Sequence, residues 1–230
     1  MNENGKIMSF LSRLGDMFIL NIMYLICCVP IVTIGAATTA LYYNTLKIAE
    51  NREGYVWKDF LKSFRQNFKQ ATIIWTLILG ATVILGIDFF LVGGISSQAV
   101  VSVIGSVVVV LGIFLILVSV YVFPILARFE NSVSKIIKYS LIMSIRHLPS
   151  TVIILLIHSI PLLLAVVSLE AFVKGLFPVL LFTVSILAYF ESKIFTRIFR
   201  YYYPKTEGRG FIIGHNKKKG GCLLWQNKQR

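Results

Sequence analysis

Two ionisable residues, Asp88 and His158, lie inside long apolar stretches of the sequence. A charged side chain costs about 2.5–3.5 kcal/mol at the centre of a membrane helix, so such residues are functional candidates. A transporter or channel would use them as a proton or substrate site. The interpretation that we favour is that neutral His158 hydrogen-bonds a neighbouring helix and that Asp88 reaches water. In either case we expect both side chains to face the interior of a helix bundle.

The sequence contains none of the common catalytic motifs. There is no GxxxxGK[ST] phosphate-binding loop, no HExxH zinc motif and no GxSxG nucleophile motif. The three histidines are scattered and the three cysteines lack CxxC spacing, which argues against a metal site. We therefore expect no enzyme activity, no cofactor and no bound metal ion.

The elements that position Asp88 and His158 are predicted from five long apolar stretches. Of the 230 residues, 57% are hydrophobic and 14% are charged, whereas a typical soluble domain has about 25% charged residues. About 20 consecutive apolar residues let a helix cross a bilayer. The sequence thus predicts an all-α, polytopic membrane helix bundle. The expected transmembrane helices cover residues 17–43, 71–92, 99–129, 148–169 and 172–190.

The basic residues predict how these spans are oriented. Twenty of the 23 Lys and Arg residues fall in residues 44–70, 128–147 and 191–230. The positive-inside rule makes these segments cytoplasmic, with the N-terminus outside and the C-terminus inside. Glu191 and Lys193 would then lie at the inner interface, where charges cost little. The net charge of +13 indicates topology and contact with the anionic inner leaflet, and we expect no nucleic-acid binding.

Pro30 and Gly35 interrupt the first apolar stretch. Proline removes a backbone donor and crowds the preceding turn, so a helix bends or breaks there. We favour one kinked helix over residues 17–43. The alternative is a full span followed by a re-entrant half-helix, with the N-terminus on the cytoplasmic side.

Glycines in the second and third predicted spans indicate close helix contacts. Small residues let helix backbones approach each other in a membrane. These glycines are Gly80, Gly86, Gly105 and Gly112.

The first predicted cytoplasmic loop contains an amphipathic helix over residues 55–70. Its aromatic side chains recur at helical spacing, and its basic side chains repeat that spacing one residue later. The aromatic stripe comprises Trp57, Phe60, Phe64 and Phe68, and the basic edge comprises Lys58, Lys62, Arg65 and Lys69. Such a helix can lie on the anionic inner leaflet, pack under the bundle or dock on another protein.

Part of the chain resembles a known family. The stretch CCVPIVTIGAATTALYY (residues 27–43), the Gly54-Tyr55 turn and the run KDFLKSFRQNFKQAT (residues 58–72) are similar to the YesL family of small bacterial membrane proteins. The resemblance spans roughly residues 1–203. It implies a multi-pass protein of the bacterial plasma membrane, encoded beside carbohydrate ABC importers and polysaccharide-degrading enzymes. It supplies no catalytic motif.

These observations lead to one expected function and two alternatives. We expect an accessory or regulatory membrane protein that associates with the permease subunits of a carbohydrate ABC importer. The alternatives are a stand-alone small transporter or channel that uses the Asp88/His158 region, and a membrane scaffold that binds the lipid surface. Residues 1–203 form the predicted membrane domain, and residues 204–230 a flexible basic tail.

Overall fold

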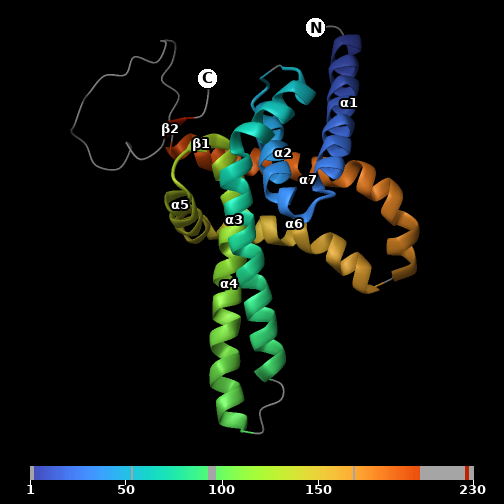
Figure 1. Cartoon of the computed structure of the whole chain (residues 1–230). Coiled ribbons are helices and arrows are strands. Elements are labelled where there is room, and N and C mark those ends of the chain that lie inside the picture. Colours follow the sequence, from blue (N-terminus) through green and yellow to red (C-terminus); the bar gives the residue numbers. More distant parts are fainter. Residues whose placement is uncertain (1–2, 53, 93–96, 168, 203–225, 228–230) are drawn as a thin grey trace, which may run out of the picture.

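The computed structural model describes residues 3–52, 54–92, 97–167, 169–202 and 226–227, and leaves out the side chains of several residues, chiefly 160–182. The described chain is helical apart from one pair of two-residue strands, which confirms the all-α prediction (Figure 1). The elements are α1 (Glu3–Cys28), the 3-10 turn η1 (Ile31–Thr33), α2 (Ile34–Ala49), α3 (Val56–Val92), α4 (Gln98–Arg128), β1 (Phe129–Glu130), α5 (Val133–Arg146), α6 (Leu148–Val167), α7 (Leu169–Tyr202) and β2 (Gln226–Asn227).

Helix α2 is the centre of the packed part of the molecule. It contacts α1, α3, α4 and α7, and ten of its 16 residues are buried. Small residues let the neighbouring backbones approach closely. A Cβ atom on Gly35 would lie 2.7 Å from the carbonyl oxygen of Ala71 and 2.7 Å from Cβ of Trp75. Gly35 is therefore a contact point between α2 and α3. It does not break a helix.

The first apolar stretch forms two helices that fold back on each other, so the favoured single kinked helix over residues 17–43 is wrong. Helix α1 ends at Cys28, and α2 begins at Ile34. The Arg13 side chain on α1 donates a hydrogen bond of 2.8 Å to Oδ1 of Asn51, which follows α2. The beginning of α1 and the end of α2 therefore lie at the same end of the molecule.

The reversal is caused by Pro30 and stabilised by side-chain hydrogen bonds. A proline has no N–H with which to continue the helix, and the carbonyls at the end of α1 need other donors. The Thr33 hydroxyl donates to the carbonyl oxygen of Cys27 at 2.6 Å. The indole N–H of Trp75, on α3, donates to the carbonyl oxygen of Ile31 at 2.8 Å. This geometry matches the alternative of a span followed by a returning half-helix.

The predicted amphipathic helix and the second predicted span form one continuous helix. Helix α3 has 37 residues and is about 55 Å long at about 1.5 Å per residue. Its first half packs on α2, whereas its second half runs beside α4 beyond the rest of the bundle (Figure 1). We call residues 77–92 and 97–116, which form this projecting part, the distal hairpin. Among its described side chains, only Val108 is buried.

Within the described part of the chain, three helices are long and apolar enough to cross a membrane: α1 over Leu11–Cys28, α3 over Val56–Leu91 and α4 over Val100–Arg128. A fourth span is possible by length and composition if α5 and α6 count as one broken span, bent by 99°. These helices are compatible with a multi-pass membrane protein, but the predicted number of five spans is not confirmed. The fourth and fifth predicted spans, residues 148–169 and 172–190, lie in α6 and α7, and many of their side chains lie outside the described residues.

Helices α6 and α7 run across the direction of α3 and α4 rather than beside them (Figure 1). Beyond α7, the described part of the chain resumes at β2, which pairs antiparallel with β1. Gln226 of the predicted tail therefore lies opposite Glu130, at the end of the long helix α4. The rest of the predicted tail, apart from Asn227, lies outside the described residues.

Candidate functional site

A buried carboxylate, Glu191, joins α7 to α2 and α6. The hydroxyl of Tyr42 donates a hydrogen bond of 2.5 Å to Oε2 of Glu191. Nδ1 of His158 lies 3.2 Å from Oε1 of the same carboxylate. Glu191 is 1% exposed, and Tyr42 is also buried. A carboxylate in this position needs such partners, because burying it without them would be costly.

Other buried polar side chains connect the same helices. The hydroxyls of Thr45 and Ser192 are 2.7 Å apart. Oδ1 of Asn21, on α1, accepts hydrogen bonds from the backbone N–H and the hydroxyl of Ser185, on α7. Polar contacts of this kind hold helices together in an apolar environment. The cluster therefore fixes α1, α2 and α7 relative to one another.

The burial of Glu191 was not predicted. The sequence predicts that Glu191 and Lys193 lie at the inner interface, where charges cost little; in the structure Glu191 points into the core and Lys193 is exposed. Residues two apart on a helix do not share a face. The spacing of residues on α7 could have indicated this burial. Ser185, Ala188, Ser192 and Phe195 recur at helical spacing, Glu191 lies on the same face, and the structure buries all five.

The structure does not bring Asp88 and His158 together. His158 also lies 3.0 Å from the carbonyl oxygen of Ile154, and its side chain is 54% exposed. His158 thus contacts a neighbouring helix, as the favoured interpretation proposed, but it does not face the interior completely. Asp88 lies four residues before the end of α3, in the distal hairpin, and is partly exposed.

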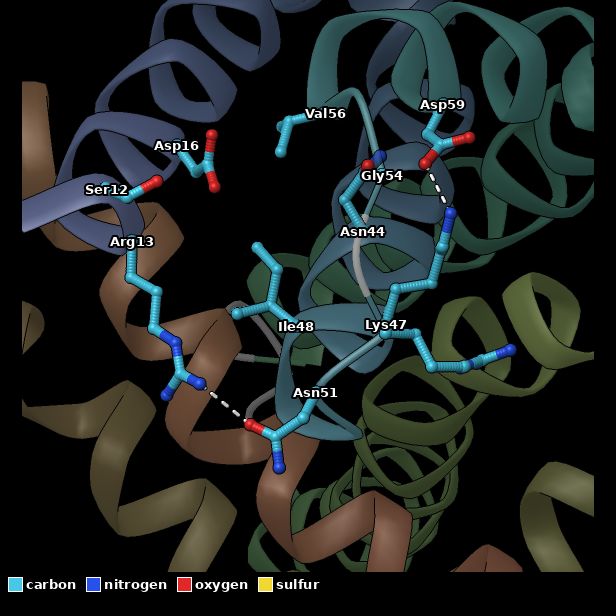
Figure 2. Close-up of a pocket in the computed structure, with 11 residues that line it drawn as sticks. Ser12, Arg13, Asp16, Asn44, Lys47, Ile48, Asn51, Gly54, Val56 and Asp59 are labelled. Atoms are coloured by element: carbon cyan, nitrogen blue, oxygen red, sulfur yellow. Dashed lines mark hydrogen bonds and ion pairs between the residues drawn. The ribbon is translucent and has the colours of Figure 1, made fainter. Parts of the chain in front are cut away.

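A second candidate site is a polar cleft where the loop between α2 and α3 meets α1 (Figure 2). The cleft has a volume of about 360 Å³. Arg13 reaches across it to Asn51, and Lys47 pairs with Asp59 (Figure 2). The lining residues are Ser12, Arg13, Asp16, Asn44, Lys47, Ile48, Asn51, Arg52, Gly54, Val56 and Asp59.

Charged residues beside the cleft are connected to α4. Oε2 of Glu50 accepts from Arg52 at 2.5 Å, and Oε1 of Glu50 lies 2.9 Å from Arg128 at the end of α4. Burial lowers the pKa of the Arg52 guanidinium, and the adjacent Glu50 carboxylate opposes this change. Gly54 leaves room for the neighbouring ion pair, because its Cβ would lie 2.6 Å from Oδ2 of Asp59.

The cleft is suited to a polar ligand or to a polar segment of another protein. Its lining includes the cations Arg13, Lys47 and Arg52 and the carboxylates Asp16 and Asp59. The sequence did not predict this site, because a single helix over residues 17–43 would keep Arg13 and Asn51 far apart.

The predicted aromatic stripe is divided between the core and the surface. Phe60 is fully buried, so it packs under the bundle and neither lipid nor a partner can reach it. The ring of Phe64 is half-buried and stacks on Phe60 at 6.4 Å. Trp57 and Phe68 are 49% and 38% exposed, respectively.

The predicted basic edge faces outward. Lys58, Lys62, Arg65 and Lys69 are all exposed. The ammonium group of Lys58 lies 4.8 Å from the ring centre of Tyr55 and 5.4 Å from that of Trp57. These contacts hold Lys58 near the exposed aromatic residues.

A comparison with protein families gave a match to part of α1, all of α2 and most of α3. A family model described as a protein of unknown function, DUF624, matches residues 17–89. This is the family that the YesL-like stretch resembles. The match includes Gly35, Tyr42 and most of the residues that line the cleft, but it does not reach His158 or Glu191. Comparisons with curated proteins and with solved structures found no match.

Proposed function

We propose that this protein is an accessory subunit of the bacterial plasma membrane that binds the permease subunits of a carbohydrate ABC importer through its distal hairpin. The observation that supports this proposal is the exposure of the hairpin. Large apolar side chains cover it on both helices, and Phe90, Val103 and Val107 are each more than 50% exposed. Such a surface requires a cover of lipid or of other transmembrane helices.

The glycines of the hairpin favour a protein partner. The sequence predicts that Gly80, Gly86, Gly105 and Gly112 mediate helix contacts. A Cβ atom on any of them would meet nothing within 4 Å outside its own helix. If these glycines permit close approach of a helix, that helix belongs to another chain. The choice of a carbohydrate importer rests on the YesL-like resemblance alone.

We propose a different membrane orientation of the N-terminus from the one predicted from the basic residues. Arg13 lies beside Asn51, so the N-terminal part of α1 shares an end with the basic segment 44–70. If that end is cytoplasmic, all Lys and Arg residues except Lys174 belong to segments on the inner side. We therefore propose that the N-terminus is cytoplasmic and that the connection between α3 and α4 is external.

Cysteine labelling tests this orientation. Single cysteines would replace Ser12, Ser97 and Ser134, all of which are exposed, in a chain that lacks Cys27, Cys28 and Cys222. In whole cells a membrane-impermeant reagent should label only position 97. Labelling at position 12 but not at position 134 would show that the ends of α1 and α2 lie on different sides and would contradict the proposal.

Co-purification tests the partner. The chain would be expressed with a carbohydrate importer from the same genome and isolated in mild detergent. Wild type should recover both permease subunits, whereas Gly86→Leu combined with Gly112→Leu should recover at least about tenfold less, because the leucines keep the partner helix away. Gly15→Leu is the matched control, since Gly15 also lies in a helix with nothing within 4 Å of its Cβ position. Equal recovery by all variants would reject the hairpin as the binding surface.

The buried carboxylate supports a second candidate, a small proton-coupled transporter or channel. Glu191, Tyr42 and His158 form a connected polar set, and His158 is partly exposed. In proteoliposomes that contain a pH-sensitive dye, such a protein would carry protons, and Glu191→Gln would abolish the flux. Asp88→Asn is the control, because Asp88 lies elsewhere. No flux through the wild-type protein would reject this candidate without affecting the first.

A further inference from the structure

A groove between α6 and α7 combines an apolar wall with two cations. It has a volume of about 320 Å³ and is lined by Ile157, Leu187, Phe190, Lys193, Ile194 and Arg197. All but Ile157 belong to α7, where Leu187, Phe190, Ile194 and Arg197 recur at intervals of three or four residues and so share one face, with Lys193 at its edge. Ile157 supplies the opposite wall from α6.

The two cations of the groove are available to a ligand. Lys193 and Arg197 are one turn apart on α7 and exposed. Lys193 lies over the ring of Tyr189 at 4.6 Å and that of Phe190 at 5.8 Å. The salt bridges that the structure gives for the described residues involve neither Lys193 nor Arg197. The nearby carboxylate of Glu191 is directed at Tyr42 and His158 instead.

The cations lie near other charged residues of the molecule. Arg197 lies five residues before Tyr202, the last residue of α7, and Tyr202 contacts His147, immediately before α6. Phe199, two residues after Arg197, packs on Phe129 next to Arg128. The cations therefore lie toward the end of the molecule that holds Arg128, Glu50 and Asn51. The apolar residues Leu187 and Phe190 precede them on α7.

We propose that this groove is a binding site for an anionic phospholipid of the inner leaflet. The phosphate would lie between Lys193 and Arg197, and a segment of one acyl chain would lie against Leu187, Phe190 and Ile157. A soluble anion would use the two cations but not the apolar wall. The acyl chain of a zwitterionic lipid would also lie against the apolar wall, but the lipid's own ammonium group would weaken the attraction between its phosphate and the two cations.

Lipid titration of the purified full-length chain tests the proposal in the absence of any importer, so its outcome is independent of the proposed function. The chain would be held in a zwitterionic detergent, and binding of phosphatidylglycerol and of phosphatidylcholine with the same acyl chains would be followed by native mass spectrometry. We expect phosphatidylglycerol to bind at least about tenfold more tightly. Lys193→Gln combined with Arg197→Gln should weaken its binding by about twenty-five-fold, at about fivefold for each cation.

Two further variants separate the groove from general attraction to a basic surface. Lys135→Gln combined with Lys138→Gln removes the same charge from exposed positions on α5 and should leave phosphatidylglycerol binding unchanged. Ile157→Trp keeps both cations but fills the groove, and it should weaken binding of both lipids. Equal loss in the α5 and α7 variants would overturn the proposal, as would equal binding of the two lipids by wild type. Displacement of the lipid by millimolar inorganic phosphate would also overturn it, because it would identify a site for soluble anions.

Discussion

The two halves of α3 both carry large apolar side chains, but these lie in opposite environments. In the first half Phe60 and Ile74 are fully buried against the central helix α2. In the second half Phe90 is 83% exposed and Ile84 is 61% exposed. The first half is amphipathic and its apolar face is packed by the chain itself, whereas the second half is apolar on all sides and is left largely exposed by the described residues.

The difference between the halves depends on small and polar residues of the neighbouring helix. Around the first half of α3, Gly35 allows close approach to Ala71, and Trp75 is hydrogen-bonded to Ile31. The second half of α3 runs beside α4 (Figure 1), and a Cβ atom on Gly80, Gly86, Gly105 or Gly112 would meet nothing within 4 Å outside its own helix. A membrane offers no hydrophobic gain for moving an apolar residue from lipid to protein, so such specific contacts decide which helices associate.

The largest expected effect is that of removing Phe60 from the packed region. Phe60→Ala should lower the free energy of unfolding by about 3–5 kcal/mol, because it leaves a cavity beneath α2. Phe68→Ala, on the same stripe but 38% exposed, should cost much less. Both can be measured by unfolding in a mixture of mild and denaturing detergents. Equal stability of the two variants would show that the first half of α3 is not packed as described.

The next prediction compares the buried carboxylate Glu191 with the partly exposed carboxylate Asp88. Glu191→Ala removes the acceptor for Tyr42 and the partner of His158, and should lower the unfolding free energy by about 1–3 kcal/mol. Asp88→Ala, in the distal hairpin, should stay within about 0.5 kcal/mol. The same unfolding assay compares the two. A larger loss for Asp88→Ala would mean that the hairpin carboxylate, and not Glu191, is the structural one.

Apolar length and charge predicted the fold class and the helical nature of the chain, but not its tertiary contacts. The all-α class follows from apolar stretches such as residues 99–129, which are long enough to predict a helix whatever they contact. The division of residues 17–43 could not be decided in that way, because Pro30 is compatible with a bend or with a reversal. The reversal depends on Arg13, Asn51, Thr33 and Trp75, whose hydrogen bonds join parts of the chain that only the folded structure brings together.

The candidate sites were predicted less well for the same reason. His158 was identified because an ionisable residue inside an apolar stretch is unusual. Glu191 was not identified because it was expected at the inner interface, where charges cost little, and its burial depends on Tyr42 and His158 from other helices. The polar cleft requires α1, α2 and α3 to meet, and no local pattern indicates that meeting.

A destabilisation of similar size is expected when a single methyl group is added at Gly35, where α2 packs on α3. Gly35→Ala would place a Cβ atom 2.7 Å from a backbone oxygen and from a neighbouring Cβ, so α2 and α3 must move apart. Overpacking of this kind costs about 1–3 kcal/mol. Melting in mild detergent, followed by circular dichroism, should show a lower midpoint than for wild type. An unchanged midpoint would mean that α2 and α3 are less closely packed.

The smallest expected effect is a stabilisation, and it tests the same substitution, glycine to alanine, in the distal hairpin. Gly112→Ala adds a Cβ atom where nothing lies within 4 Å outside its own helix. Alanine is favoured over glycine in a helix interior by about 1 kcal/mol, so the substitution should stabilise the isolated chain by up to that amount. The measurement is the same melting experiment, with Gly15→Ala on α1 as a matched control that should behave alike. Destabilisation by Gly112→Ala alone would mean that a helix already packs against this glycine in the purified protein, as in a self-associated form. In that case a concentration-dependent midpoint would identify the second copy of the chain as the partner of the hairpin.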